Sequence, residues 1–344
     1  MRKFAVIVVG AGPGGLSCGR LLAAAGVSVL VVERKKEIGP KVCGGGITWD
    51  GLIRRVPGSL IRGSFRHQYL FSPWQRVVVR EPDPIIATVG RRDLGRYMEQ
   101  QARAAGARIR SGTRLLAVEP GIVTIGRRGA ARERIGYDFL VGADGSASGI
   151  RKYLGVPTKK YGLGIDCRLP LQLKKMEWHF NPRLFGSGYG WIFPHGHTVS
   201  IGAYTTRGTI SPHRLHKNLM EWGAGLGFDL RDGRTGAGLV NYDYRGVKFR
   251  DNIWLVGDAA GLASGLTGEG MYPAIVSGEG VAGAILGETE ALKPVQRLAA
   301  KQALHSRVLT LTGRSTLRRL LVAESFLLLL RLKLLDFRRL EMAE

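Results

Sequence analysis

The sequence predicts an α/β fold with α+β elements, in which a Rossmann-like nucleotide-binding domain is interleaved along the chain with an antiparallel-sheet domain. Three observations support this prediction. Residues 4–33 have the pattern of strand, glycine turn, helix and strand; two later apolar strands end in Asp-Gly or Gly-Asp; and the segments between alternate short β-rich runs with Pro and Gly. A chain of 344 residues is long enough for two such domains.

The order of these patterns gives the expected boundaries. The nucleotide-binding domain should comprise residues 1–60, 85–160 and 248–293. The antiparallel-sheet domain, which would carry the substrate site, should comprise residues 61–84 and 161–247. Residues 294–344 are expected to form a short, basic, helical C-terminal segment.

The opening unit carries a glycine fingerprint directly between a strand and a helix. Gly10, Gly12 and Gly15 match the pattern G-x-G-x-x-G, and Pro13 and Gly14 lie between the last two. The first glycine permits the tight turn, the second lets the backbone approach a pyrophosphate, and the third lets helix and strand pack closely. The helix N-terminus would then face the phosphates with free N–H groups. The fingerprint predicts dinucleotide binding.

Acidic residues at three strand ends indicate which dinucleotide binds. Glu33 ends the second strand, where an acid bonds the hydroxyls of the adenosine ribose. Asp144 and Gly145 end one later apolar strand, and Gly257 and Asp258 end another. A simple NAD site does not need the last pair, whereas the ribityl chain of FAD needs a carboxylate and nearby backbone donors. These strand ends therefore favour FAD.

A second glycine-rich helix start follows Asp258. Gly268, Gly270 and Met271 precede a small-residue helix, and its N–H groups are expected to face the flavin pyrimidine ring. Negative charge accumulates on that ring when the flavin is reduced, so a helix N-terminus there is favourable. The alternative is a glycine-rich helix start that packs against a neighbouring element.

Composition limits the other classes of function. The net charge of +24 indicates attraction to an anionic partner, but the chain contains no nucleic-acid-binding motif, so no specific nucleic-acid partner is expected. Three cysteines and no secretory signal favour a reducing, cytoplasmic location. The apolar residues 320–335 are interrupted by Glu324, Arg331 and Lys333, which indicates a buried or interfacial helix rather than a membrane span.

The combination of motifs resembles a known class of flavoprotein. GAGPGG with Glu33 and Arg34, GADGSAS, and LVGDAAG resemble the FAD-dependent oxidoreductases of the p-hydroxybenzoate hydroxylase fold. Within that fold, KVCGGGI, GYGWIFPHG and LTGEGMYPAIVSGEGVA resemble the geranylgeranyl reductase family. The similarity covers residues 4–290 approximately, and the combination is more specific than any one motif.

The resemblance implies roles for the segment after the first unit. Cys43 would lie near the reactive face of the flavin, with a buried packing cysteine as the alternative. Gly44 and Gly45 would let the backbone lie against the isoalloxazine ring and leave an open chamber for a long apolar substrate. Arg91 matches a position where related flavoproteins bind the FAD phosphate, although Arg92 could take that role.

Two aromatic residues would form a wall of the same chamber. Tyr189 and Trp191 alternate along one strand, so both rings lie on one face, either as a pocket wall or as ordinary core. The lysine that the family usually has after F-P is His195 here. His195 and His197 have a spacing seen in metal sites, but no cysteine or carboxylate is clustered with them, so no metal is predicted.

The resemblance implies an enzyme that reduces isolated carbon–carbon double bonds in isoprenoid chains by hydride transfer from flavin N5. Electrons would come from NAD(P)H or reduced ferredoxin. With no second G-x-G-x-x-G between an expected strand and an expected helix, a nicotinamide donor would have to reach the flavin without its own Rossmann domain. One alternative is an FAD-dependent monooxygenase or hydroxylase of the same fold; a halogenase is disfavoured because GYGWIFP supplies only one of two signature tryptophans. A second alternative is a non-catalytic, membrane-associated flavoprotein.

The C-terminal segment bears on membrane association. It has ten basic residues against four acids, mixed with leucines. An amphipathic helix of this kind could bind anionic lipid and bring the enzyme to an isoprenoid lipid substrate on the inner face of the membrane. A helical lid packed on the protein is the alternative.

Overall fold

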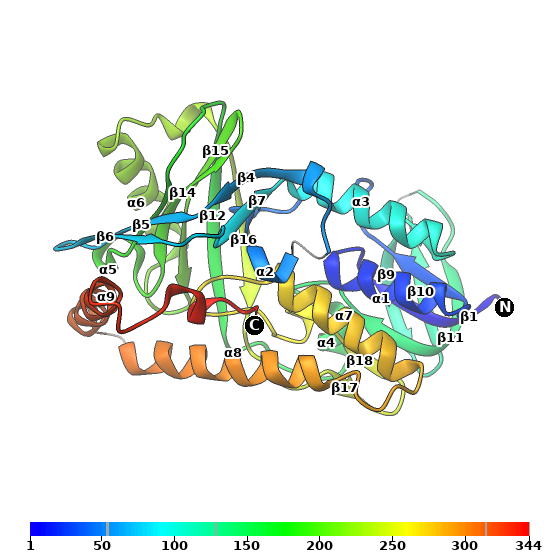
Figure 1. The fold of residues 1–344 in the computed structure, drawn as a ribbon. Coiled ribbons are helices and arrows are strands. Elements are labelled where there is room, and N and C mark those ends of the chain that lie inside the picture. The colour runs from blue at the N-terminus through cyan, green and yellow to red at the C-terminus, as the bar shows by residue number, and fades with distance from the viewer. Residues whose placement is uncertain (53–54, 128, 314, 344) are drawn as a thin grey trace.

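Two sheets lie side by side in the computed structural model, which describes residues 1–52, 55–127, 129–313 and 315–343 (Figure 1). Within this part of the chain the first sheet has eight strands. Its main path follows the order β17 (Lys248–Phe249), β18 (Ile253–Leu255), β11 (Glu133–Gly142), β1 (Lys3–Val9), β2 (Val29–Val32) and β8 (Arg108–Arg110). β10 (Ile122–Gly126) pairs antiparallel with β11, and β9 (Arg114–Glu119) pairs antiparallel with β10.

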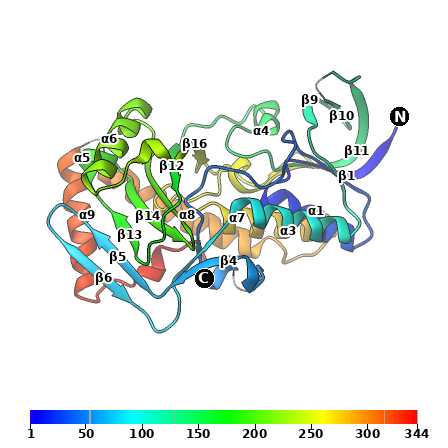
Figure 2. The ribbon, with the colours of Figure 1, turned by 90° about the horizontal axis from the view of Figure 1, so that it is seen from above.

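The five strands from β18 to β8 are parallel to one another. β1 lies between β11 and β2, with Val8 opposite Val141 and Val31. These valines are fully buried, as expected for a parallel sheet covered on both faces. α1 (Pro13–Ala24) packs against both α3 (Arg91–Ala104) and α7 (Met271–Ile285), and Figure 2 shows the three helices beside one another.

The second sheet carries the predicted substrate side of the molecule. Its seven strands follow the order β16 (Arg234–Asn241), β12 (Tyr161–Leu169), β15 (Thr198–Thr206), β14 (Tyr189–His195), β13 (Met176–His179), β5 (His67–Phe71) and β6 (Arg76–Arg80). All pairs are antiparallel except β13 with β5. α5 (Pro182–Phe185) and α6 (Pro212–Gly225) pack on this sheet.

A small sheet connects the two large ones. Its order is β3 (Gly46–Thr48), β7 (Ile86–Val89) and β4 (Ile61–Phe65). It joins β3 and β7, from segments predicted as nucleotide-binding, to β4, from a segment predicted in the other domain. Both β4 and β7 contact β14. The arrangement of the sheets confirms the predicted fold class.

The short helical elements are α2 (Trp49–Leu52), α4 (Gly149–Tyr153) and the 3-10 turns Gly58–Leu60, Leu230–Asp232, Gly257–Ala259 and Phe337–Leu340. The C-terminal segment forms two helices, α8 (Lys293–Thr312) and α9 (Thr316–Arg331). α8 follows the length of the molecule and α9 packs against β6 and α5 (Figure 1). α9 begins where the Ser315 side chain accepts a hydrogen bond from the N–H of Arg318. Arg314, one of the ten basic residues of this segment, lies outside the described residues.

Candidate functional site

The glycine fingerprint forms the turn between β1 and α1. Gly10 has a φ of 107°, which favours glycine, and a Cβ there would lie 2.3 Å from the backbone that follows β11. A Cβ on Gly15 would lie 1.9 Å from the oxygen of Gly10, so this glycine lets the helix pack onto the turn. A Cβ on Gly12 would meet nothing within 4 Å. The fingerprint residues that line a large cavity are Gly10, Gly12, Pro13 and Gly14.

The backbone at the start of α1 is free to bind an anion. No side chain caps this helix, so its first N–H groups have no intrahelical or side-chain acceptor. Glu33 lines the cavity beside the turn, and its carboxylate accepts hydrogen bonds from the N–H groups of Ala11 and Lys35, both at 2.9 Å. Arg34 also lines the cavity. Glu33 therefore joins the end of β2 to the glycine turn.

Arg91 carries buried donors with no acceptor in the described protein. Its Nε and Nη1 atoms are buried and unpartnered, and the residue lines the cavity. Arg92 is instead an exposed residue whose Nε lies 2.9 Å from a Glu37 oxygen. A buried guanidinium with free donors requires an anion. Together with the open backbone at Gly12, it fits the diphosphate of a dinucleotide such as FAD.

Asp144 and Gly145 follow β11 at the same edge of the sheet. Both oxygens of Asp144 are used by its own loop: Ser148 Oγ donates to one at 2.5 Å, and the N–H of Gly149 donates to the other at 2.6 Å. Burial raises the pKa of Asp144. Gly145 has a φ of 82° and open space where a Cβ would lie. Asp144 therefore shapes the loop, while Gly145 leaves backbone accessible to a ligand.

Asp258 lies at the end of β18, in the turn that begins at Gly257, and both residues line the cavity. One Asp258 oxygen accepts hydrogen bonds from Lys41 Nζ at 3.0 Å and Ser146 Oγ at 2.8 Å. These contacts bring three separate segments together: the loop after β2, the loop after β11 and the turn after β18. The contact of Asp258 with Lys41 was not predicted.

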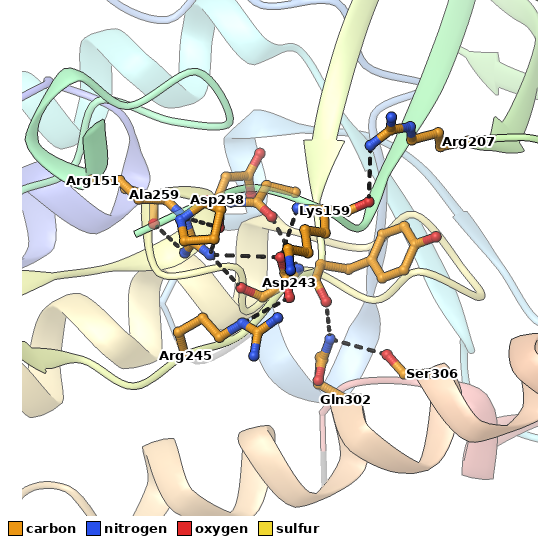
Figure 3. A network of polar contacts seen from close by, with 12 residues as sticks. Arg151, Lys159, Arg207, Asp243, Arg245, Asp258, Ala259, Gln302 and Ser306 are labelled. Atoms are coloured by element: carbon orange, nitrogen blue, oxygen red, sulfur yellow. Dashed lines mark hydrogen bonds and ion pairs between the residues drawn. The ribbon is translucent and has the colours of Figure 1, made fainter. Parts of the chain in front are cut away.

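A buried polar network binds the backbone of the Asp258 turn (Figure 3). Arg151, which is 2% exposed, donates to the carbonyl oxygens of Ala259 at 3.1 Å and Asp243 at 2.7 Å. Asn241 Nδ2 donates to the carbonyl oxygen of Asp258 at 2.8 Å. Burial lowers the pKa of Arg151. The network fixes the backbone of the turn, so the carboxylate of Asp258 keeps its position.

The glycines of the loop at residues 43–46, the CGGG loop, have a different neighbour from the one predicted. A Cβ on Gly44 would lie 3.0 Å from Trp191 Nε1, and one on Gly46 would lie 3.1 Å from Phe193. Gly45 has a φ of 73°, and a Cβ there would lie 2.3 Å from His195 Cε1. The space beside these glycines is therefore filled by β14. The absent side chains let the loop pack on the aromatic strand, with Cys43 and the loop backbone lining the cavity.

β14 forms an aromatic wall of the cavity. Tyr189, Trp191 and Phe193 are all buried and all line it. The Tyr189 hydroxyl donates to the carbonyl oxygen of Thr267 at 2.5 Å, and Trp191 Nε1 donates to Ser200 Oγ at 2.8 Å. The wall is thus held on one side by the loop before α7, where Gly268, Gly270 and Met271 also line the cavity.

His195 continues β14 but does not line the cavity. Its Nε2 lies 2.7 Å from the carbonyl oxygen of Gly44. Burial, with a smaller effect of Arg168, lowers the pKa of His195 to about 4, so the imidazole is neutral near pH 7. A neutral ring that donates to Gly44 holds the CGGG loop and brings no charge to the chamber. His197 lies in the following turn and is exposed.

One continuous cavity of 1220 Å³ connects all these parts. Beyond the cofactor residues it extends into an apolar chamber under α8 and α9. The apolar residues that line this chamber are Trp178, Phe180, Tyr189, Trp191, Phe193, Leu304, Val308, Leu309, Val322, Ala323, Phe326, Leu335 and Phe337. The C-terminal segment also contributes His305, Thr312, Arg319, Arg339 and Glu341 to the cavity lining. The C-terminal segment is therefore packed on the protein and supplies much of the chamber wall.

Two family models match the first half of the chain. The Thi4 family matches residues 1–94, and an FAD binding domain matches residues 68–165. Digeranylgeranylglycerophospholipid reductase 2 of Methanosphaera stadtmanae is 30% identical over 300 residues, which cover 79% of this chain and 75% of that protein. The chloroplastic geranylgeranyl diphosphate reductase of Oryza sativa subsp. japonica is 27% identical over 318 residues, 83% of this chain and 67% of that protein.

Solved structures share the fold. A geranylgeranyl bacteriochlorophyll reductase-like protein from Thermoplasma acidophilum has a TM-score of 0.76 at 21% identity, covering 95% of this chain and 88% of its own. A flavin-dependent brominase has a TM-score of 0.69 at 14% identity, covering 99% and 94%. At these identities the likeness shows the fold alone.

Fold, relatives and the cofactor cradle together define the chain as an FAD-dependent oxidoreductase. More narrowly, it belongs to the geranylgeranyl reductase family, as the similarity to the Methanosphaera protein shows. The family predicted from the sequence motifs is thereby confirmed.

Four parts of the site were not predicted. Lys41 and Glu269 lie inside the two family motifs KVCGGGI and LTGEGMYPAIVSGEGVA, and that position is the signal that could have found them. The lining residues of α8 and α9 have no motif, and neither has Glu341, which also lines the cavity. Their position depends on how the C-terminal segment folds back.

Proposed function

We propose that this protein reduces carbon–carbon double bonds in the isoprenoid chain of a lipid. The observation that carries the proposal is the apolar chamber, which is continuous with the cofactor cradle and is wide and aromatic enough for a branched hydrocarbon. The reductases named above act on geranylgeranyl substrates according to their names, and this chain is 27% and 30% identical to them over 318 and 300 residues.

The cradle residues have separable tasks in this proposal. Gly12 and the start of α1 bind the diphosphate with backbone N–H groups, and Arg91 adds a charged donor. Glu33 binds the adenosine ribose, and Asp258 with Gly145 binds the ribityl chain. Gly270 and Met271, at the start of α7, would hold the pyrimidine end of the flavin with backbone N–H groups. When bound and reduced, FAD supplies the hydride.

The chamber residues orient the substrate and exclude water. The CGGG loop and β14 pack on each other and together line the cavity, so an alkene lying against them is desolvated next to Cys43. We assign Tyr189 and Trp191 to substrate positioning because their polar atoms already have partners and their rings face the cavity. Apolar walls bind the chain without using specific hydrogen bonds.

The proposal is tested with the FAD-loaded protein, reduced under anaerobic conditions and mixed with geranylgeranyl diphosphate or a digeranylgeranyl phospholipid in vesicles. We expect flavin reoxidation and a product that gains two hydrogen atoms for each bond reduced. Reoxidation by oxygen alone, with a hydroxylated product, would favour a monooxygenase instead. No reaction with either lipid would refute the proposal.

A pair of variants tests the chamber itself. Ala323→Trp fills it from α9, while Ser325→Trp places the same side chain on the exposed side of that helix, outside the cavity. Only the first should abolish reoxidation by the lipid, and both should retain bound FAD. Equal activity of the two variants would place the substrate elsewhere.

The electron donor is proposed to be NAD(P)H or a reduced ferredoxin. Each would act at the open side of the cavity, since the second match to G-x-G-x-x-G, at Gly278, Gly280 and Gly283, lies inside α7 and not between a strand and a helix. Rapid mixing of the oxidised protein with NADH, NADPH or reduced ferredoxin, followed at the flavin absorbance, separates these donors. A donor that reduces the flavin no faster than dithiothreitol does is eliminated.

We further propose that α8 and α9 bind an anionic membrane surface. Their outer sides expose a group of apolar residues, the leucine surface: Leu304, Leu311, Leu317, Leu321, Val322, Leu328, Leu329, Leu332 and Leu334. Exposed cations lie among them, namely Arg307, Arg318, Arg331 and Lys333. Apolar area together with cations is the combination that anionic lipid binds. No described helix is long and apolar enough to cross a membrane.

The leucine surface adjoins the chamber. Leu304 is 56% exposed, Val322 is 40% exposed, and both also line the cavity, so lipid at this surface would meet the chamber opening. Changing Leu311, Leu317 and Leu321 to serine should weaken co-sedimentation with phosphatidylglycerol vesicles by about tenfold per leucine. The control is Leu116→Ser on β9, exposed but remote from these helices. Equal sedimentation of both variants would refute membrane binding by this surface.

A further inference from the structure

Two carboxyl groups from distant parts of the sequence meet at the cavity wall. Glu269 lies in the loop before α7, and Glu341 follows the 3-10 turn Phe337–Leu340. Both line the cavity, and Glu341 is only 7% exposed. Residues 337–343, the C-terminal strap, bring Glu341 into this position.

The two carboxyl groups have different contacts. Glu269 accepts hydrogen bonds from Thr48 Oγ1 at 3.3 Å and from the N–H of Met342 at 2.8 Å, so its two oxygens hold the strap against β3. Glu341 Oε1 is buried and has no hydrogen-bond partner among the described residues. A buried carboxyl oxygen without a partner is costly when it is charged, and the cost is much smaller when the group holds a proton.

The cations near this pair are bound to other groups. Lys301 Nζ donates to the carbonyl oxygen of Ala343 at 3.1 Å, and Arg338 Nη1 lies 2.9 Å from an Asp50 oxygen. In the described part of the chain neither cation forms an ion pair with Glu269 or Glu341. Two further titratable groups face the pair: Tyr189, whose hydroxyl donates to Thr267, lies near Glu269, and Asp50 lies near Glu341.

The surroundings favour protonated carboxyl groups at neutral pH. Burial raises the pKa of Glu269 to about 7. Burial, and after it the neighbouring Glu269, raises the pKa of Glu341 to about 8, against a smaller opposing effect of Arg338. Glu341 therefore holds a proton near pH 7, beside the space assigned to the substrate.

We propose that Glu341 donates the proton that alkene reduction requires, and that Glu269 is a positioning residue that holds the strap and keeps Glu341 protonated. This inference rests on the proposed function. One alkene carbon receives a hydride from the reduced cofactor, the π bond breaks, and the other carbon takes the proton as the O–H bond of Glu341 breaks. The alkene gains two electrons, the cofactor loses two, and water returns a proton to the carboxylate.

The test uses the FAD-loaded full chain and three variants. Glu341→Gln keeps the side-chain volume and removes the acid, and Glu341→Asp keeps an acid. The matched control is Glu324→Gln, since Glu324 is a carboxyl group with the same 7% exposure that does not line the cavity. Infrared difference spectra at pH 7 should show the carbonyl stretch of a protonated carboxylic acid that is lost in E341Q and kept in E341D.

The second readout is anaerobic, single-turnover reoxidation of the reduced protein by geranylgeranyl diphosphate in phosphatidylglycerol vesicles. E341Q should react about 10²-fold more slowly, at the lower end of what a positioned acid contributes. The rate of the wild-type protein should fall as pH rises and Glu341 loses its proton. Glu269→Gln should move this fall to lower pH, because the negative charge that raises the pKa of Glu341 is removed. E341D should keep a pH-dependent rate, and E324Q should behave as the wild-type protein.

The outcomes are distinct. If the wild-type protein reacts and E341Q has the same rate and pH profile, Glu341 is not the donor and only this inference fails. If E341Q shows the same carboxylic acid band at pH 7 as the wild-type protein, the inference fails irrespective of activity. If the wild-type protein reduces no prenyl lipid, the proposed function fails and this inference fails with it.

Discussion

Replacing Arg91 with leucine should weaken FAD binding and at the same time stabilise the protein without FAD. The Nε and Nη1 atoms of Arg91 are buried without acceptors, and the residue lines the cavity beside the glycine turn. A charge-assisted hydrogen bond contributes about 1.5–3 kcal/mol, so two bonds to a diphosphate amount to about 3–6 kcal/mol. At about 1.4 kcal/mol for each factor of ten, R91L should raise the Kd of FAD by about 10²–10⁴-fold.

The apoprotein should respond in the opposite direction. Buried donors without acceptors destabilise a fold by about 1–3 kcal/mol, and leucine removes them. The assay is fluorescence titration of apoprotein with FAD, together with chemical denaturation in the absence of FAD. The control is Arg92→Leu, which removes only an exposed ion pair with Glu37 and should change the Kd by no more than about fivefold. Unchanged FAD affinity of R91L would refute the assignment of Arg91 to the diphosphate.

Three further changes test the fold around the site. Gly45→Ala should destabilise the protein by more than Gly26→Ala. Both glycines have positive φ, and the left-handed conformation costs a residue with a side chain about 1–2 kcal/mol, but only at Gly45 would a Cβ lie 2.3 Å from His195. Equal melting temperatures of the two variants would contradict the packing argument. Burial raises the pKa of Glu341 from 4.5 to about 8, so the folded state binds more protons over this interval and the free energy of unfolding should fall as pH rises. Denaturant titrations should show a smaller fall in E341Q, and an identical slope would contradict the buried acid. Arg151→Met should lower the free energy of unfolding by about 3 kcal/mol or more, since it leaves buried carbonyl oxygens without donors; a loss below about 1 kcal/mol would show that water replaces the guanidinium.

The parts of the site that could be predicted from the sequence are those that local geometry determines. The turn at Gly10 needs a positive φ, Gly15 needs the absence of a side chain because a Cβ there would overlap the Gly10 oxygen, and Gly12 leaves open space beside the turn. A pattern of this kind indicates a turn that binds a dinucleotide. Asp258 could be placed because it ends an apolar strand, and parallel strands end at one edge of the sheet.

The parts that could not be predicted depend on contacts between distant segments. The glycines after Cys43 were expected to leave an open chamber, whereas Trp191, Phe193 and His195 occupy the space beside them. That the loop packs on β14 follows from how the small sheet connects the two large ones, and no local pattern encodes this connection. Likewise, the position of Glu341 depends on the return of the C-terminal strap to the loop before α7.

α8 restricts how the molecule can open. Its 20 residues correspond to about 30 Å of continuous helix. Val295 near its start belongs to the core of the first sheet, Gln302 donates to the carbonyl oxygen of Tyr242 next to β16, and Leu309 near its end lines the chamber. A hinge motion that separated the two sheets would have to break α8 or detach one of its ends from the protein. Ligand exchange is therefore expected to proceed by small local displacements at the rim, with the two halves remaining a single rigid body throughout turnover.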